Sequence, residues 1–162
     1  GRRAVSDPFL WVKWVHILSA TVLFGTGLGT AFHMLATHLR GNVIAIAGMT
    51  RNTVLADWLF TAVAGVVQPI TGFWMIYLAG YDFLESWLIT TYALYVVAGA
   101  CWLKVVQLQY HMRKYALLAA ERNEALPMEY HQDMRLWIIL GCPAFLSLVI
   151  AFALMVMKPQ LW

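Results

Sequence analysis

Apolar residues are gathered in four long runs, and the length of these runs indicates the class of protein. A membrane-spanning helix needs about 20 mostly apolar residues, because the hydrocarbon core is about 30 Å thick and a helix rises about 1.5 Å per residue. Four segments reach that length: 9–38, 53–79, 87–111 and 136–157. The pattern predicts an all-α integral membrane protein, a bundle of four transmembrane helices in a single transmembrane domain covering residues 1–162.

Polar and breaker residues punctuate these segments. Asp7 can cap the first helix, and Pro8 suits its first turn. Pro69 lies at the centre of the second segment, where a proline removes a backbone hydrogen bond and kinks the helix. We expect the neighbouring Gln68 to repair that kink by bonding the freed backbone. Pro143 is expected to interrupt the fourth segment.

The connectors between the segments differ in character. The apolar part of residues 43–52 is too short to span a membrane, and we expect this connector to lie in the membrane interface. The middle turn, residues 80–86, is short and acidic. Beyond Lys104 the third segment becomes polar, so its helix is expected to leave the membrane and continue to about Ala120.

Charge is sparse, and its distribution predicts an orientation. Only 12% of the residues are charged, against about 25% in an ordinary soluble domain. Lys and Arg are more frequent in the first and third connectors than in the tails, which hold Arg2, Arg3 and Lys158, and the middle turn has none. The residues counted in those two connectors are Arg40, Arg51, Arg113, Lys114, Arg122 and Arg135. Because cytoplasmic loops are enriched in Lys and Arg, we expect a multi-pass protein of the bacterial inner membrane with both termini in the periplasm.

An outer aromatic belt should follow from this orientation. Its expected members are Trp11, Trp14, Tyr77, Tyr81, Trp87 and Trp162. The net charge of +3 is explained by the membrane topology, and no nucleotide-binding or zinc-finger spacing is present. The expected surroundings are therefore the lipid bilayer, and nothing supports a nucleic-acid partner.

His16 is the strongest candidate for chemistry, because ionisable groups inside a bilayer are costly and usually functional. Counted from Phe9 as the outer boundary, it lies roughly 10 Å deep. Lys13 lies one turn above it on the same face and can extend its amine to the surface. A neutral imidazole at this depth can ligate haem iron, relay a proton or hydrogen-bond another helix. Iron ligation and the interhelical hydrogen bond are equally compatible with the sequence.

A second iron ligand would come from the same depth on another helix. Met75 lies at this level on the second segment, and Thr91 and Tyr92 lie there on the third, but no second histidine does. A bis-histidine haem is therefore not expected. A His/Met pair using Met75 and a five-coordinate site both stay open, although methionine more often packs than ligates.

A second polar cluster is expected at the inner surface, formed by His33, His38, Asp57, Lys104, Gln107 and His111. One interpretation is a solvated helix end in which Asp57 pairs with Arg51 or Lys104, and interfacial charges of this kind are common. The other is a cytoplasmic substrate or metal site. The first is preferred because a carboxylate near a helix N-terminus is already favoured electrostatically.

Several motifs resemble a known superfamily. Residues 11–17 (WVKWVHI) resemble the opening W-x-K-x-x-H-I of the HemJ-type protoporphyrinogen oxidases and their copper-resistance-D-like relatives. Residues 72–74 (GFW), residues 87–88 (WL) and the closing Pro143 and Lys158-Pro159 stand in the order that this superfamily shows. The resemblance covers nearly the whole chain.

The chain looks closer to a sister family of small bacterial membrane proteins of unknown function. In that family, residues 56–61 (ADWLFT), 68–72 (QPITG) and 135–137 (RLW) look typical.

The resemblance implies a haem site. HemJ-type enzymes are similar four-helix membrane proteins that bind haem b and oxidise protoporphyrinogen, and their essential histidine maps onto His16. They also need a lysine four residues after the tryptophan of the W-L pair, a position held here by Thr91. The resemblance therefore implies a haem pocket around His16, with Lys13 near a propionate, and puts the oxidase activity in doubt.

Three functions follow as hypotheses. The first is a haem-b-binding membrane protein that transfers electrons or handles haem or porphyrin. The second is a HemJ-like oxidase with a substituted base, so whether the chain is an enzyme stays open. The third is a non-catalytic membrane subunit or small transporter, docked or dimerised through the small residues Gly25, Gly27 and Gly29.

Overall fold

The structure is a computed structural model that describes residues 7–162, and these residues form helices joined by short turns. The helices are α1 (Pro8–Arg40), α2 (Val43–Ala56), a π-helical turn η1 (Asp57–Thr61), α3 (Ala62–Ala79), α4 (Ser86–Arg122) and α5 (Met128–Met157). Since α2, η1 and α3 follow one another without a break, the chain makes four rods. All four are long and apolar enough to cross a membrane, which confirms the predicted all-α membrane architecture. Arg2 and Arg3, used in the charge count, lie outside the described residues.

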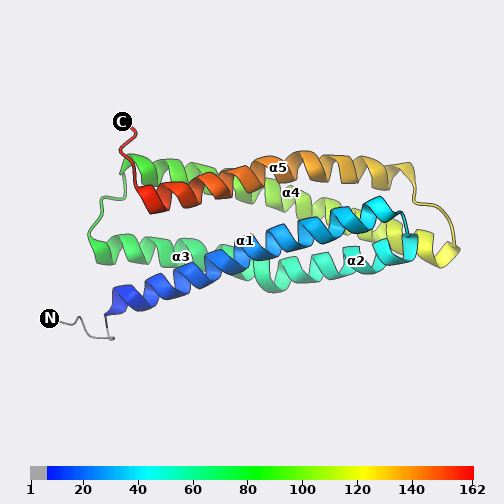
Figure 1. The fold of residues 1–162 in the computed structure, drawn as a ribbon, viewed down its shortest axis with the longest axis horizontal. Coiled ribbons are helices and arrows are strands. Elements are labelled where there is room, and N and C mark those ends of the chain that lie inside the picture. Colours follow the sequence, from blue (N-terminus) through cyan, green and yellow to red (C-terminus); the bar gives the residue numbers. More distant parts are fainter. Residues whose placement is uncertain (1–6) are drawn as a thin grey trace.

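The rods associate as two pairs. Helix α1 packs against α3, and α4 packs against α5 along most of its length. Helix α2 contacts both α1 and α4, so it joins the two pairs at the end where the α1–α2 turn lies. Figure 1 shows the pairs diverging toward the opposite end, where the N- and C-termini lie. There, aromatic contacts connect the pairs, including Phe24 with Phe145 and Phe73 with Tyr92.

The predicted ends of α1 are confirmed. Asp7 accepts a hydrogen bond from the backbone N–H of Phe9 at 3.0 Å, and Pro8 occupies the first turn. At the other end Gly41 has φ +70°, a conformation that glycine adopts at little cost, and its N–H bonds the carbonyl of His38.

Residues 43–52 do not form a separate connector, as the sequence had predicted, and their depth in the interface stays a prediction. Residues 43–52 are the first turns of α2, capped by the Asn42 side chain, which accepts from the Ala45 N–H at 3.0 Å. Ile46 and Met49 of this segment are buried in the main apolar core. Packing against protein, rather than lipid, therefore determines its conformation. Pro143 does not interrupt α5, which is continuous from Met128 to Met157.

The best-packed core lies at the end where α2 joins the two pairs. Its fully buried side chains include Met34 of α1, Met112 of α4 and Tyr130 of α5. A smaller cluster of Ile76, Trp87 and Leu88 lies at the other end. Large apolar side chains elsewhere are exposed along every rod, as expected when lipid is the surrounding solvent.

One member of the expected aromatic belt is placed differently. Trp11, Trp14, Tyr77, Tyr81 and Trp162 are exposed, but Trp87 is only 6% exposed. Its indole N–H donates to Glu85 at 2.6 Å, and the Lys158 amine lies 5.9 Å from its ring centroid. Trp87 therefore stabilises the end of the bundle instead of facing the membrane interface.

Candidate functional site

His16 contacts α3 through one ring nitrogen. Its Nδ1 lies 2.7 Å from the hydroxyl of Thr71. That hydroxyl donates its single proton to the carbonyl of Val67, one turn earlier, at 2.8 Å. With this proton on the Val67 carbonyl, Thr71 accepts from an N–H at Nδ1, and in that tautomer the lone pair of the imidazole lies on Nε2. The interhelical hydrogen bond foreseen for His16 is thus present and occupies only half of the ring's bonding capacity.

Gln68 holds the same stretch of α1. Its amide donates to the carbonyl of His16 at 2.7 Å and also to the hydroxyl of Ser19. The expectation that Gln68 repairs the proline kink is therefore wrong. Gln68 and Thr71 lie three residues apart and face the same neighbour, so they fix the position and the rotation of the His16 ring together.

The kink is repaired by another residue. Pro69 has no N–H for the carbonyl of Gly65, four residues earlier. The hydroxyl of Tyr95 on α4 donates to that carbonyl instead. Because the repair comes from a neighbouring helix, Gln68 is available to bind α1.

The surroundings of His16 fit a haem ligand. A Cβ added at Gly72 would lie 3.4 Å from Cε1 of His16, so this glycine lets the ring lie directly against α3. Nε2 has no hydrogen-bond partner among the described residues. A ligating histidine usually donates its other N–H to a fixed acceptor, which sets the tautomer and the ring orientation, and Thr71 supplies that acceptor.

The donor set fits haem better than a bare metal ion. Within residues 7–162, no group of three or more His, Cys, Asp or Glu side chains is arranged to hold a metal. Haem iron needs only one or two protein ligands. Met75, half-buried on α3, lies one turn beyond Thr71 on the same face, and its role as a second ligand stays a prediction.

The remaining predicted pocket residues have local partners or none. Thr91 donates to the Trp87 carbonyl at 2.7 Å, and Tyr92 donates to the Phe83 carbonyl at 3.2 Å. Tyr92 also packs on the small cluster around Trp87. Lys13 is exposed on α1. Contact of these three residues with a cofactor stays a prediction.

Asp57 is not at a solvated helix end. It lies inside the continuous rod of α2, η1 and α3 and is 5% exposed. Its carboxylate accepts from the Gln109 amide at 2.5 Å and from the Thr61 hydroxyl at 3.1 Å. The expected pairing with Arg51 or Lys104 is therefore wrong, because burial beside α4 gives the carboxylate two neutral donors instead of a cation.

The expected inner cluster does not assemble. Lys104 bonds Gln107 at 2.9 Å on the exposed face of α4. His111 lies 3.9 Å from Asp133 of α5. His38 bonds the hydroxyl of Tyr130 at 3.1 Å, and His33 lines a separate cavity between α1 and α2. These residues share one end of the bundle but face different neighbours.

Sequence reasoning missed three of the residues that matter most here. Thr71 and Ser19 were not singled out as partners of His16, and Gln109 was not singled out as a partner of Asp57. Depth was the available signal for the first two, since both lie within a few residues of the His16 level on helices that pack together.

Comparison with known proteins adds the family. No curated protein and no solved structure matches the chain. The sequence model of DUF2269, described as a predicted integral membrane protein, matches residues 10–159. That match covers all four rods, including His16 and its partners on α3. The chain therefore belongs to the DUF2269 family of predicted integral membrane proteins.

Proposed function

We propose that this protein binds haem b through Nε2 of His16. The observation that carries the proposal is the bond from Nδ1 of His16 to Thr71, because Thr71 is committed as an acceptor by its own bond to Val67. An imidazole fixed in this way presents an unprotonated nitrogen without any further change. The resemblance of residues 11–17 to the HemJ-type opening points to the same ligand.

The chain's own residues would have distinct parts in this site. His16 ligates the iron, while Thr71 and Gln68 fix its ring and its backbone from α3. Lys13, one turn toward the outer surface, suits a propionate carboxylate. Met75 is the available second ligand. Bound haem would supply one-electron exchange, which suits electron transfer or haem handling in the bacterial inner membrane.

Oxidase chemistry has less support. The position that carries an essential lysine in HemJ-type enzymes is Thr91, and its hydroxyl is already bonded to the carbonyl of Trp87. A hydroxyl in that state is a poor base. Complementation of a strain lacking protoporphyrinogen oxidase tests this alternative directly, and growth would make the chain an oxidase.

A subunit role is favoured by one separate observation. A Cβ added at Gly25, Gly27 or Gly29 would meet nothing within 4 Å among the described residues. Small residues of this kind usually mark a face where membrane helices approach closely. Gly25 and Gly29, four residues apart, share one face of α1, and Gly27 lies on another. Nothing among the described residues packs against Gly25 or Gly29, so a second protein or a second copy could cover their face.

The absorption spectrum of the detergent-solubilised protein, oxidised and dithionite-reduced, tests haem binding. We expect a Soret band in the wild type, supplied with haem if needed, and its loss in His16→Ala. His33→Ala changes an exposed histidine on the same helix and should leave the band unchanged. Thr71→Val should keep the band but weaken haem binding about 10- to 100-fold, because it removes the acceptor for Nδ1.

A colourless wild type after haem is supplied would refute the proposal. So would a band that persists in His16→Ala. A colourless protein that instead co-purifies with one fixed membrane partner would favour the subunit role.

A further inference from the structure

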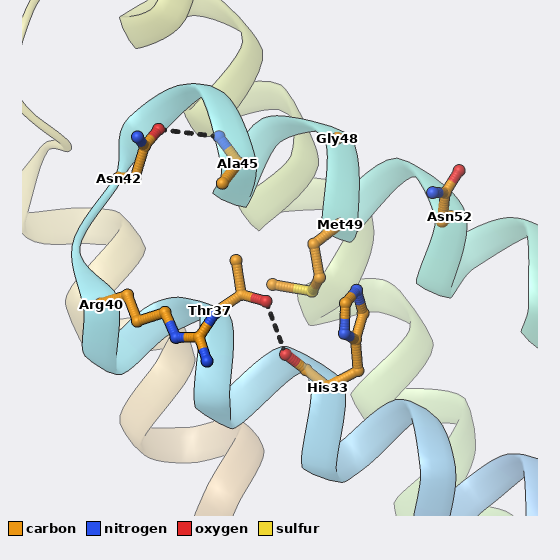
Figure 2. Close-up of a pocket in the computed structure, with 8 residues that line it drawn as sticks. All are labelled: His33, Thr37, Arg40, Asn42, Ala45, Gly48, Met49 and Asn52. Atoms are coloured by element: carbon orange, nitrogen blue, oxygen red, sulfur yellow. Dashed lines mark hydrogen bonds between the residues drawn. The ribbon is translucent and has the colours of Figure 1, made fainter.

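A polar cavity of about 550 Å³ lies between the end of α1 and the start of α2. Figure 2 shows it in close-up, with the guanidinium of Arg40 beside Thr37 and the imidazole of His33 facing Met49. Asn42 and Asn52 of α2 complete the polar lining. The cavity is separate from the His16 site, which lies between α1 and α3.

The cavity carries positive charge without a matching acid. Residues 8–56, which make up both helices that line it, contain no Asp or Glu. Arg40 is always charged. The partial positive charge at the start of α2 is offset by the partial negative charge at the end of α1, so the guanidinium decides the sign of the local charge. The lining therefore favours an anion.

Its donors are available. Thr37 already bonds the carbonyl of His33 at 2.8 Å, and Asn42 uses its carbonyl oxygen to cap α2. Within the described chain, the side chains of Arg40, His33 and Asn52 make no hydrogen bond or ion pair. A guanidinium and an imidazole thus lie free beside one space, with Asn52 on its rim, and phosphate oxygens accept from both the guanidinium and the imidazole.

The depth of the cavity matches lipid headgroups. His33 lies about 36 Å along α1 from Phe9, at about 1.5 Å per residue. The hydrocarbon core is about 30 Å thick, and the headgroup layers extend the bilayer to about 40–45 Å. His33 is therefore at the outer edge of the headgroup layer. The backbone of Arg40 lies two turns farther out, and its side chain extends back toward Thr37 (Figure 2).

We propose that this cavity binds the phosphate of an anionic phospholipid, held by Arg40 and His33, with Asn52 on its rim. Basic pockets between transmembrane helices bind anionic headgroups on the cytoplasmic side, which is where the Lys and Arg distribution places this end of the bundle. The buried Met49 offers an apolar wall toward the acyl chains. This site is independent of haem binding.

Native mass spectrometry of the detergent-solubilised full chain tests the proposal, with phosphatidylglycerol, phosphatidylcholine and inorganic phosphate titrated separately. We expect one tight phosphatidylglycerol site that Arg40→Gln weakens about tenfold or more, because a hydrogen bond to a charged group is lost. Asn52→Ala should weaken it to a lesser degree. Arg51→Gln is the matched control. It removes the same charge from the position next to Asn52 in the sequence, and Arg51 does not line the cavity.

Three outcomes would overturn the proposal. Equal weakening by Arg40→Gln and Arg51→Gln would mean that bulk charge attracts the lipid. Equal binding of phosphatidylcholine would mean that the negative charge of the headgroup does not contribute to binding. Inorganic phosphate that binds as tightly as phosphatidylglycerol and displaces it would make the free anion the ligand. Arg40 and Asn52 are exposed, so both variants should fold, and an unchanged circular dichroism spectrum checks this.

Discussion

At the scale of single residues, the buried carboxylate of Asp57 is paired with neutral donors instead of a cation. The carboxylate of Asp57 takes two hydrogen bonds, from Gln109 and Thr61. Gln109 in turn accepts from the indole N–H of Trp137 at 3.1 Å. One glutamine therefore connects η1, α4 and α5, and without it the buried Trp137 indole would lose its acceptor and Asp57 would keep only Thr61 as a donor.

Substituting Gln109→Ala should lower the free energy of unfolding by about 2–3 kcal/mol, because a hydrogen bond to a buried carboxylate is worth more than a neutral one. The measurement is reversible unfolding in mixed detergent micelles. Gln107→Ala is the control: the same substitution two residues away, on the exposed face of α4, should change stability by less than about 0.5 kcal/mol. Equal effects of both substitutions would show that the network does not stabilise the fold.

At the scale of helices, α3 is defined by a proline and its repair. Pro69 leaves the carbonyl of Gly65 without its helical donor, and Tyr95 of α4 provides one. This bond is a direct polar link between the α1–α3 pair and the α4–α5 pair. It lies close to the residues that hold His16.

A double-mutant cycle tests the repair. Tyr95→Phe should destabilise the wild type by about 1 kcal/mol, since the Gly65 carbonyl loses its partner. In a Pro69→Ala background the new N–H can bond that carbonyl, so the same change should cost only a few tenths of a kcal/mol. Tyr77→Phe, on an exposed residue, is the control. Additive effects in the cycle would rule out the repair.

The sequence predicts the helices better than their partners. Run lengths predict four rods, and the structure confirms Asp7 as the cap of α1 and Pro8 in its first turn. Partner choice depends on how each helix is rotated about its axis, and apolar residues surround these helices on all sides because lipid is the solvent. Gln68 and Tyr95 were both at the right depth, yet only the rotation of α3 decides which one meets Gly65.

Segment 43–52 was mispredicted for a related reason. This segment is too short to span a membrane alone. Its apolar residues could contact either lipid or protein, and the sequence does not distinguish the two. Its helix depends on contacts with α4, more than 50 residues away in sequence.

At the scale of the whole molecule, the rods are longer than a bilayer needs. The 33 residues of α1 extend about 50 Å, against a hydrocarbon core of about 30 Å. The extra length lies at the end that holds the well-packed core, the polar half of α4 and the cavity lined by His33 and Arg40. Lys and Arg concentrate at this end, which is why we expect it to face the cytoplasm.

Reporter fusions test that orientation. Alkaline phosphatase, which is active only in the periplasm, should be active when fused after Trp162 and inactive when fused in the α4–α5 turn after Asn123. A green fluorescent protein fusion at the same two positions serves as the control and should give the opposite pattern. The reverse pattern for both reporters would invert the proposed topology.

The π-helical turn η1 sets the angular phase between the two halves of the rod formed by α2, η1 and α3. Each residue turns an α-helix by about 100°, and a π-turn accommodates one residue more than the α-helix around it. Because the wider turn takes up this extra residue, winding the same residues as a regular α-helix would rotate everything beyond 57–61 by about that angle. Gln68 and Thr71 would then point away from α1, while the contacts of α2 stayed as they are. The π-turn therefore allows one continuous rod to face α4 at one end and His16 at the other.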